Sequence, residues 1–183
     1  MNAVEPIRDR EKVQDIADYL KSKNERDYVL WMFGIYTALR VSDILKMRVR
    51  DVKDKDYVVM REQKTKNEKK FIINKKLRKA IDHYIKGKED YELLFKSRQG
   101  GEKAISRQQA YNIIKQAAAH FNIYNVGTHT MRKTFGYHMY MKTKDGMLLM
   151  KIFNHSDIHI TLRYIGVEQD TINKAMAAFD LAY

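Results

Sequence analysis

The 183-residue sequence contains no cysteine and a single proline, Pro6. The absence of cysteine excludes disulfide bonds, thiolate zinc sites and cysteine nucleophiles. Apolar runs are far shorter than the ~20 residues that span a bilayer, and the N-terminus is charged from Glu5 onward. We therefore predict neither a membrane segment nor a signal peptide, and expect a cytoplasmic protein.

Interdomain linkers are not evident either, because the sequence has almost no proline, no internal repeat and no low-complexity tract. Hydrophobic residues make up 44% of the chain and aromatic residues 11%, which is typical of a globular protein. The length fits the roughly 100–200 residues of one domain. We predict a single domain over residues 1–183.

Acidic residues are outnumbered: 35 Lys and Arg stand against 23 Asp and Glu, for a formal net charge of +12. Such an excess attracts polyanions and speeds their encounter, so nucleic acid is the leading partner. A basic surface that is merely solvated is the alternative. The net charge does not indicate whether the nucleic acid is DNA or RNA.

The spacing of apolar residues predicts a mostly helical chain. Apolar residues recur at i, i+3, i+4 and i+7 in the first helical stretch, whereas the second is apolar on nearly all sides and predicts a central buried helix. We expect helices over about 10–22, 26–39, 42–46, 75–87, 106–121, 128–142, 146–153, a short one after 156, and 168–180. The expected N-caps are Ser42, Ser106, Thr128 and Ser156.

The period changes between Tyr57 and Ile73, where two β-branched and aromatic runs flank a polar stretch containing Asn67. This pattern predicts a β-hairpin. Residues 97–102 include two adjacent glycines and are expected to form a loop. The predicted fold class is therefore mainly α with a small antiparallel β-sheet (α+β).

Candidate functional residues lie in separate segments. Arg40 stands at a predicted helix junction, with Asp43 three residues on to orient its guanidinium. Lys64 lies in the turn of the predicted hairpin, where a flexible ammonium group can reach a phosphate or donate a proton. In isolation, the first pair is an ordinary helix-surface contact and Lys64 belongs to a basic turn.

Two further segments follow. His129 and Arg132 are three residues apart at the start of a predicted helix, so both project from one face near its positive end, an arrangement that favours an anion. His155 is followed nine residues later by Tyr164. Taken singly, a capping histidine, a solvated arginine and one of 12 tyrosines carry little information.

Together these segments resemble the tyrosine recombinase, or phage integrase, family, whose signature is Arg, Lys, His-x-x-Arg, His or Trp, and Tyr, in that order. The matching residues are Arg40, Lys64, His129, Arg132, His155 and Tyr164. Residues 38–43 also look like the family's first arginine box. The resemblance covers the chain from about residue 10 to the end and implies the catalytic-domain fold of tyrosine recombinases.

The resemblance implies site-specific recombination of double-stranded DNA, through a covalent bond between Tyr164 and a 3′ phosphate. Arginine forks and imidazole groups suit the anionic oxygens of a phosphodiester, because they hold charge while the attacking and leaving oxygens align. Lys64 would protonate the leaving 5′ oxygen, and His129 would accept the proton of Tyr164. Neither a metal ion nor another cofactor is implied. The expected assembly is a monomer when free and a tetramer on DNA, associated with the nucleoid.

The sequence departs from the family pattern in length. Only 39 residues precede Arg40, too few for the usual core-binding domain, so we predict that this domain is absent here. The chain is then either a fragment or a small family member. Asn154 replaces a common glycine and Lys133 a frequent histidine.

Alternatives remain at this stage. The apolar residues of the last helix, Ile172, Met176 and Phe179, either contact a neighbouring protomer or cover the domain's own core. His155 and His159 have the i, i+4 spacing of a zinc pair, but no third ligand completes a recognisable set. A non-catalytic DNA-binding regulator with the same fold and a DNA-relaxing topoisomerase are the competing functions.

Overall fold

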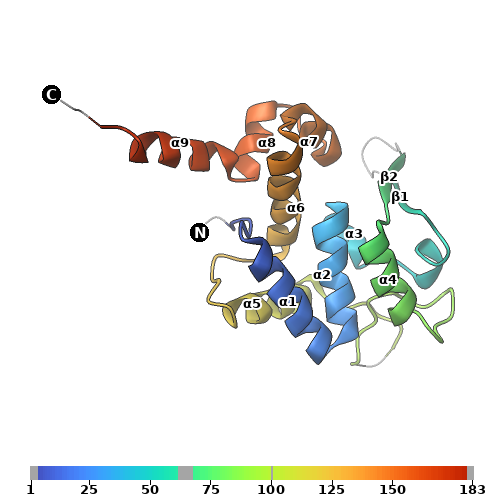
Figure 1. Ribbon diagram of the computed structural model, residues 1–183. Helices are drawn as coiled ribbons and strands as arrows, with labels where there is room; N and C mark the ends of the chain where they lie inside the picture. The colour runs from blue at the N-terminus through green and yellow to red at the C-terminus, as the bar shows by residue number, and fades with distance from the viewer. Residues whose placement is uncertain (1–3, 62–67, 100, 181–183) are drawn as a thin grey trace.

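The computed structural model describes residues 4–61, 68–99 and 101–180, and within them the fold is mainly helical with one two-stranded antiparallel sheet (Figure 1). This arrangement confirms the predicted fold class. The elements are α1 (Arg10–Lys23), α2 (Glu25–Thr37), α3 (Val41–Ile44), the 3₁₀ helix η1 (Val49–Asp51), β1 (Tyr57–Arg61), β2 (Glu68–Ile72), α4 (Lys75–Tyr84), α5 (Arg107–Ala119), α6 (Thr128–Thr143), α7 (Gly146–Phe153), α8 (Ile158–Tyr164) and α9 (Val167–Ala177).

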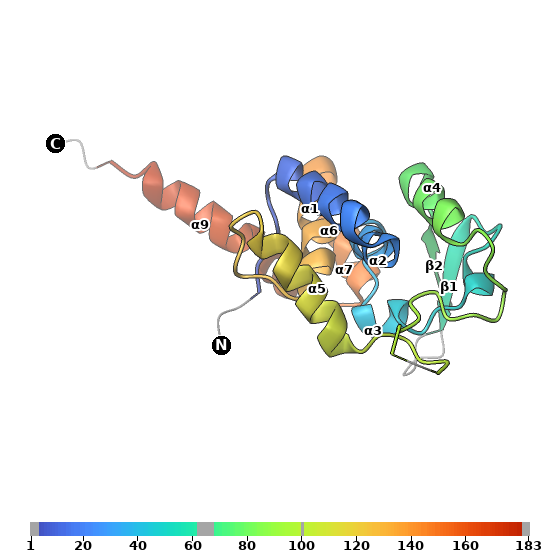
Figure 2. The ribbon, with the colours of Figure 1, turned by 90° about the horizontal axis from the view of Figure 1, so that it is seen from below.

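The predicted hairpin is confirmed in its two strands. Tyr57 pairs with Ile72 and Arg61 with Glu68, so β1 and β2 run antiparallel in a regular register. Residues 62–67, which connect the strands, lie outside the described ranges. In Figures 1 and 2 the hairpin lies beside α4, at the opposite side of the molecule from α9.

Helix α2 runs through the main core, as its apolar sequence predicts. The side chains of Trp31 and Phe33 are buried, and the Phe33 ring meets Phe95 edge to face at 5.9 Å. Gly34 allows α6 to approach closely, because a Cβ at this position would lie 2.6 Å from the Cβ of Met131. The α2–α6 contact therefore fixes α6 against the core.

A second, smaller core joins α6 to α7 and α8, at one end of α6 (Figure 1). Phe153 of α7 and Ile165, just after α8, are fully buried. A Cβ on Gly136 of α6 would lie 2.6 Å from side-chain atoms of both residues, so glycine permits this packing. The segment carrying Tyr164 is consequently held closely against α6.

Residues 4–8, which we call the N-terminal strap, lie along α6. The backbone N–H of Ile7 donates to Thr134 Oγ1 at 2.9 Å, and His138 Nε2 lies 3.0 Å from the Ile7 carbonyl oxygen. Arg8 then reaches α9, where its Nε donates to both carboxylate oxygens of Asp170 at 2.8 and 3.1 Å. The strap therefore connects α6 with the first turns of α9.

Helix α9 projects away from the rest of the molecule in both views (Figures 1 and 2). Its apolar residues Ile172 and Met176, together with Phe179 just beyond it, are 47%, 73% and 71% exposed. Of the two alternatives for these side chains, the one in which they cover the domain's own core is therefore wrong. They are available for contacts with another molecule.

Several helix boundaries differ from those expected. Ser106 caps α5 as predicted, and its hydroxyl accepts from the Gln109 N–H at 3.0 Å. Ser42 instead lies inside α3, which begins after Arg40. The N-cap of α6 is Gly127 rather than Thr128, and that of α8 is Asp157 rather than Ser156. Each of these two N-caps lies one residue from the expected one.

Five helices, α2, α3, α4, α5 and α9, end before the predicted residue. Helix α2 ends at Thr37, before the predicted Leu39, and α4 ends at Tyr84 rather than at residue 87. In the described ranges we find no helix with the length and apolar character needed to cross a membrane.

Candidate active site

Arg132 is anchored in the first turns of α6 by the backbone of two other segments. Its side chain is only 6% exposed, and its guanidinium donates to the carbonyl oxygens of Ala38 and, at 3.1 Å, Phe153. Ala38 has a left-handed backbone (φ 56°) at the turn between α2 and α3. The guanidinium also lies 4.6 Å from the centre of the Phe153 ring. These contacts fix the position of a buried positive charge.

Arg40 supplies a second guanidinium at the N-cap of α3. Its side chain is exposed, and no hydrogen bond to it is found in the described part of the chain. Its charge lowers the pKa values of His129 and His155 and opposes protonation of Arg132, so all four groups share one electrostatic environment. The two arginines predicted from separate segments are therefore brought together.

Asp43 was expected to orient the guanidinium of Arg40, but in the structure its carboxylate acts on Arg132. No hydrogen bond joins the two side chains among the described residues, whereas the Asp43 carboxylate raises the pKa of Arg132. Burial has the larger, opposite effect and leaves the Arg132 pKa below its usual value. The carboxylate thus partly compensates the buried guanidinium.

Tyr164 is the last residue of α8, and its hydroxyl oxygen lies 3.3 Å from Nδ1 of His129. Burial raises the pKa of the Tyr164 phenol, while the charges of Arg132 and Arg40 act in the opposite direction. The phenol is therefore protonated at neutral pH, and ionisation requires a base at hydrogen-bond distance. His129 is such a base.

The His129 imidazole is suited to accept this proton. Burial lowers the pKa of His129, and the positive charges of Arg132, Arg40 and Lys133 lower it further. The ring is consequently neutral near pH 7, with one nitrogen free to accept.

His155 also lies beside Tyr164, with its ring centre 5.3 Å from that of the tyrosine. Its Nδ1 lies 3.0 Å from Oγ1 of Thr161. Burial lowers the pKa of His155, and Arg132 and Arg40 lower it further. This imidazole is also neutral near pH 7.

The sequence did not single out two residues that contact this cluster as contributors to it. The ammonium group of Lys133 lies 5.2 Å from the centre of the Tyr164 ring and donates to the Val4 carbonyl oxygen at 2.6 Å. Lys133 had been noted only as a departure from the family pattern. Thr161 is fully buried, and its place one turn before Tyr164 is a weak signal that becomes informative only with the fold.

Lys64, the remaining predicted site residue, lies outside the described residues. The strands on either side of it belong to the hairpin described above.

The residues that the structure describes contain no group of three or more His, Asp or Glu side chains arranged to hold a metal ion. His159, the second member of the candidate zinc pair, is exposed, and its backbone N–H donates to the Asp157 carboxylate at 2.6 Å.

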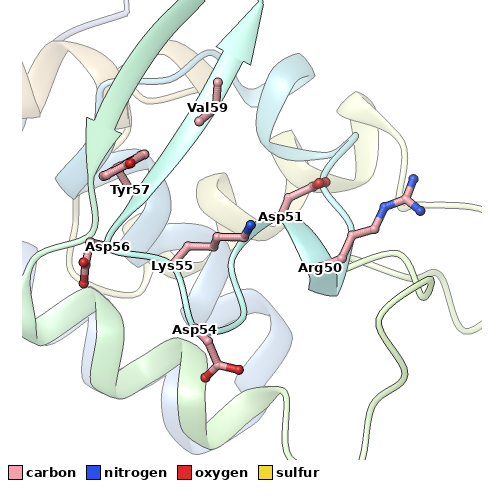
Figure 3. Close-up of a pocket in the computed structure, with 7 residues that line it drawn as sticks. All are labelled: Arg50, Asp51, Asp54, Lys55, Asp56, Tyr57 and Val59. Atoms are coloured by element: carbon pink, nitrogen blue, oxygen red, sulfur yellow. The ribbon is translucent and has the colours of Figure 1, made fainter.

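A cavity of about 330 Å³ lies elsewhere, between η1, β1 and the turn connecting them (Figure 3). Its lining residues are Arg50, Asp51, Asp54, Lys55, Asp56, Tyr57 and Val59. None of the predicted site residues lines it. The chemistry of the arginines, histidines and tyrosine is therefore separate from this cavity.

Comparison with known proteins identifies the family to which the chain belongs. A model of the phage integrase family matches residues 8–170, which is most of the chain. The chain belongs to the phage integrase family. It is 49% identical over 179 residues to the probable integrase/recombinase YoeC of Bacillus subtilis (strain 168), covering 98% of each chain.

Solved structures share the integrase-family fold at low sequence identity. A crystal structure of XerA recombinase has a TM-score of 0.77 and 17% identity, covering 99% of this chain and 66% of that one. XerH site-specific recombinase bound to its palindromic difH substrate, in a post-cleavage complex, has a TM-score of 0.71 and 14% identity, covering 97% and 54%. The chain thus spans two thirds or less of these recombinases, but nearly all of YoeC.

Proposed function

We propose that this integrase-family chain is a site-specific DNA recombinase that cleaves and rejoins double-stranded DNA through a bond between Tyr164 and a 3′ phosphate. The observation that carries the proposal is the 3.3 Å separation of the Tyr164 oxygen and His129 Nδ1, beside the guanidinium groups of Arg132 and Arg40. A nucleophile, a neutral base and two permanent cations are the groups that phosphoryl transfer requires.

The arginines would hold the phosphate. A phosphodiester repels an incoming oxygen because its non-bridging oxygens are anionic, and fixed positive charge compensates that repulsion as the reaction proceeds. Arg132 is held by backbone carbonyls, whereas the exposed Arg40 side chain has its donors available to a ligand. We assign Arg132 to a fixed contact and Arg40 to one that forms when DNA binds.

Proton transfer completes the assignment. His129 accepts the phenol proton as the Tyr164 oxygen forms its bond to phosphorus and the bond to the 5′ oxygen breaks. Lys64 donates a proton to that leaving oxygen, and His155 donates a hydrogen bond to the phosphate. Because one phosphodiester replaces another, the intermediate is reversible and the proposal requires neither ATP nor a metal ion.

We further propose that recombination proceeds in a tetramer on DNA, at the nucleoid in the cytoplasm, from subunits that are monomeric when free. The complex of the related fold in XerH with difH supports DNA as the partner. The net charge of +12 supports binding to a polyanion. The exposed apolar residues of α9 support a contact between subunits.

Covalent trapping tests the proposal. A pool of duplexes with a randomised central sequence, each nicked near a candidate cleavage position, is incubated with the protein in EDTA. Cleavage releases a short 5′-hydroxyl strand that diffuses away, so the protein–DNA adduct accumulates and survives denaturing electrophoresis. We expect an adduct with the wild type, and its sequence identifies the target. The adduct peptide should contain Tyr164.

Tyr164→Phe is the matched control, because it removes one oxygen and preserves the ring. It should bind the selected duplex and form no adduct. If the wild type binds duplex DNA yet forms no adduct across the pool, the recombinase proposal fails and the DNA-binding regulator is favoured. An adduct that forms only with added divalent cations contradicts the metal-independent mechanism.

A further inference from the structure

Thr161 is a fully buried polar residue between two parts of the candidate site. Its Oγ1 lies 3.0 Å from Nδ1 of His155 and 3.3 Å from the carbonyl oxygen of Asp157. Thr161 is also one helical turn before Tyr164 on α8. The hydroxyl therefore connects the histidine ring to the helix that carries the tyrosine.

The hydroxyl has one proton and two neighbours that can accept it. The Asp157 carbonyl already accepts the backbone N–H of Thr161 at 3.4 Å, and its separation from Oγ1 is the longer of the two. Nδ1 of His155 lies closer and has no other hydrogen-bond partner in the described residues. The hydroxyl can donate to the Asp157 carbonyl while Nδ1–H of His155 donates to Oγ1, or it can donate to an unprotonated Nδ1 at the shorter separation. The tautomer of His155 decides between these two arrangements.

The charges around His155 determine its protonation state. Among the described residues, the charged or titratable groups that face it are Arg132 from α6, Arg40 from the turn before α3, and Tyr164 from α8. Burial and the two arginines lower the pKa of His155, so the ring is neutral near pH 7. A neutral imidazole has one N–H, and Nδ1 is occupied by Thr161. Under the proposed function His155 donates to the phosphate, so its proton is on Nε2 and Nδ1 accepts from the Thr161 hydroxyl.

We propose that Thr161 is a positioning residue: its hydroxyl donates to Nδ1 of His155 and holds the neutral ring with its proton on Nε2, directed to the DNA phosphate. The tautomer and the direction toward the phosphate rest on the proposed function. The same contact fixes the ring relative to α8, so His155 and Tyr164 are positioned together. A hydroxyl two bonds from the backbone is well suited to this purpose because a buried threonine has few rotamers.

Nitrogen-15 NMR of the whole chain, labelled at histidine, tests the tautomer without DNA. At pH 7.5 we expect His155 to show an unprotonated Nδ1 and a protonated Nε2 in the wild type and in Thr161→Ser. Thr37→Val, which removes a buried hydroxyl on α2 that donates to the Phe33 carbonyl, should leave the His155 signals unchanged. A proton on Nδ1 in the wild type overturns the proposal, whether or not the protein cleaves DNA.

A double-mutant cycle then tests whether Thr161 acts through His155. Thr161→Val should lower the single-turnover rate of adduct formation about 10-fold, the effect of losing one hydrogen bond, and Thr161→Ser should restore most of the rate. In a His155→Ala background, Thr161→Val should have almost no further effect. An equal loss in both backgrounds indicates a purely structural threonine and contradicts the proposal. If the wild type forms no adduct, the proposed function is wrong. The NMR experiment still tests the tautomer of His155, because it does not depend on DNA cleavage.

Discussion

At the scale of single residues, the two arginines of the site have the same charge and different surroundings. Arg132 is buried and bound to two carbonyl oxygens, whereas Arg40 is exposed and its guanidinium has no hydrogen bond among the described residues. Hydrogen bonds from a buried cation contribute to folding, but an exposed side chain without partners contributes little. The two arginines should therefore differ in their effect on the stability of the domain but not in their effect on its chemistry.

We expect Arg132→Ala to lower the free energy of unfolding by about 2–4 kcal/mol, because two buried carbonyl oxygens lose charged donors. Arg40→Ala should change it by less than about 0.5 kcal/mol. Both should slow adduct formation by roughly 10²–10³. Urea denaturation and single-turnover cleavage measure the two quantities. Equal stability losses would contradict the distinction between a structural anchor and a free donor.

The residue types of the site were predictable from the sequence, but the contacts that hold these residues in place were not. Arg40, His129, Arg132, His155 and Tyr164 were identified because their order and spacing resemble the tyrosine recombinase signature, and the structure places them together. The anchoring of Arg132 depends on a carbonyl almost a hundred residues earlier in the chain, a contact that only tertiary packing creates. Thr161 escaped notice for the same reason.

At the scale of elements, periodicity located the helices and strands but not their exact ends. Apolar spacing reports which face is buried, and this signal extends over a whole helix. A cap depends on the backbone dihedral angles of one residue, so a serine or threonine beside the true start is easily chosen. Gly127 and Asp157 cap α6 and α8 where Thr128 and Ser156 were expected.

The apolar residues of α9 show a further limit, because an amphipathic pattern does not say which molecule covers the apolar side. We expect the combined variant Ile172→Gln, Met176→Gln and Phe179→Gln to unfold at nearly the wild-type urea concentration, since these side chains are exposed. Val167→Ala, at a buried position of the same helix, should cost roughly 1 kcal/mol. Denaturation of the free protein compares the two.

Assembly on DNA is the second measurement on these variants. Under the proposed function, the triple variant binds the selected duplex and fails to form tetramers in analytical ultracentrifugation, whereas Val167→Ala retains them at a temperature where it is folded. Normal tetramers from the triple variant would show that α9 does not supply the contact between subunits.

At the scale of the whole molecule, three histidines couple folding to pH. Burial lowers the pKa values of His129, His138 and His155 in the folded protein, and arginine charges add to this effect. The unfolded chain, whose histidines titrate near 6.5, therefore binds more protons than the folded chain below that pH. Their contribution is complete above pH 6.5 and is lost as the pH falls.

We expect the urea midpoint to decrease between pH 7.5 and 5.5 at constant ionic strength. Carboxylates titrate near pH 4 and remain charged over this range. His138→Gln keeps an amide donor for the Ile7 carbonyl and removes one titrating group, so its midpoint should depend less on pH. A midpoint that is constant or rises toward pH 5.5 would contradict this account.

The N-terminal strap has a mechanical consequence for the molecule. Its residues are bonded to α6 by Ile7, to α9 by Arg8, and to Lys133, whose ammonium group lies over the Tyr164 ring. Because only Ile165 and Gly166 lie between Tyr164 and α9, a force on α9 from a bound subunit would be divided between this backbone and the Arg8–Asp170 ion pair. The two ends of the described chain thus share the attachment of α9 to the molecule.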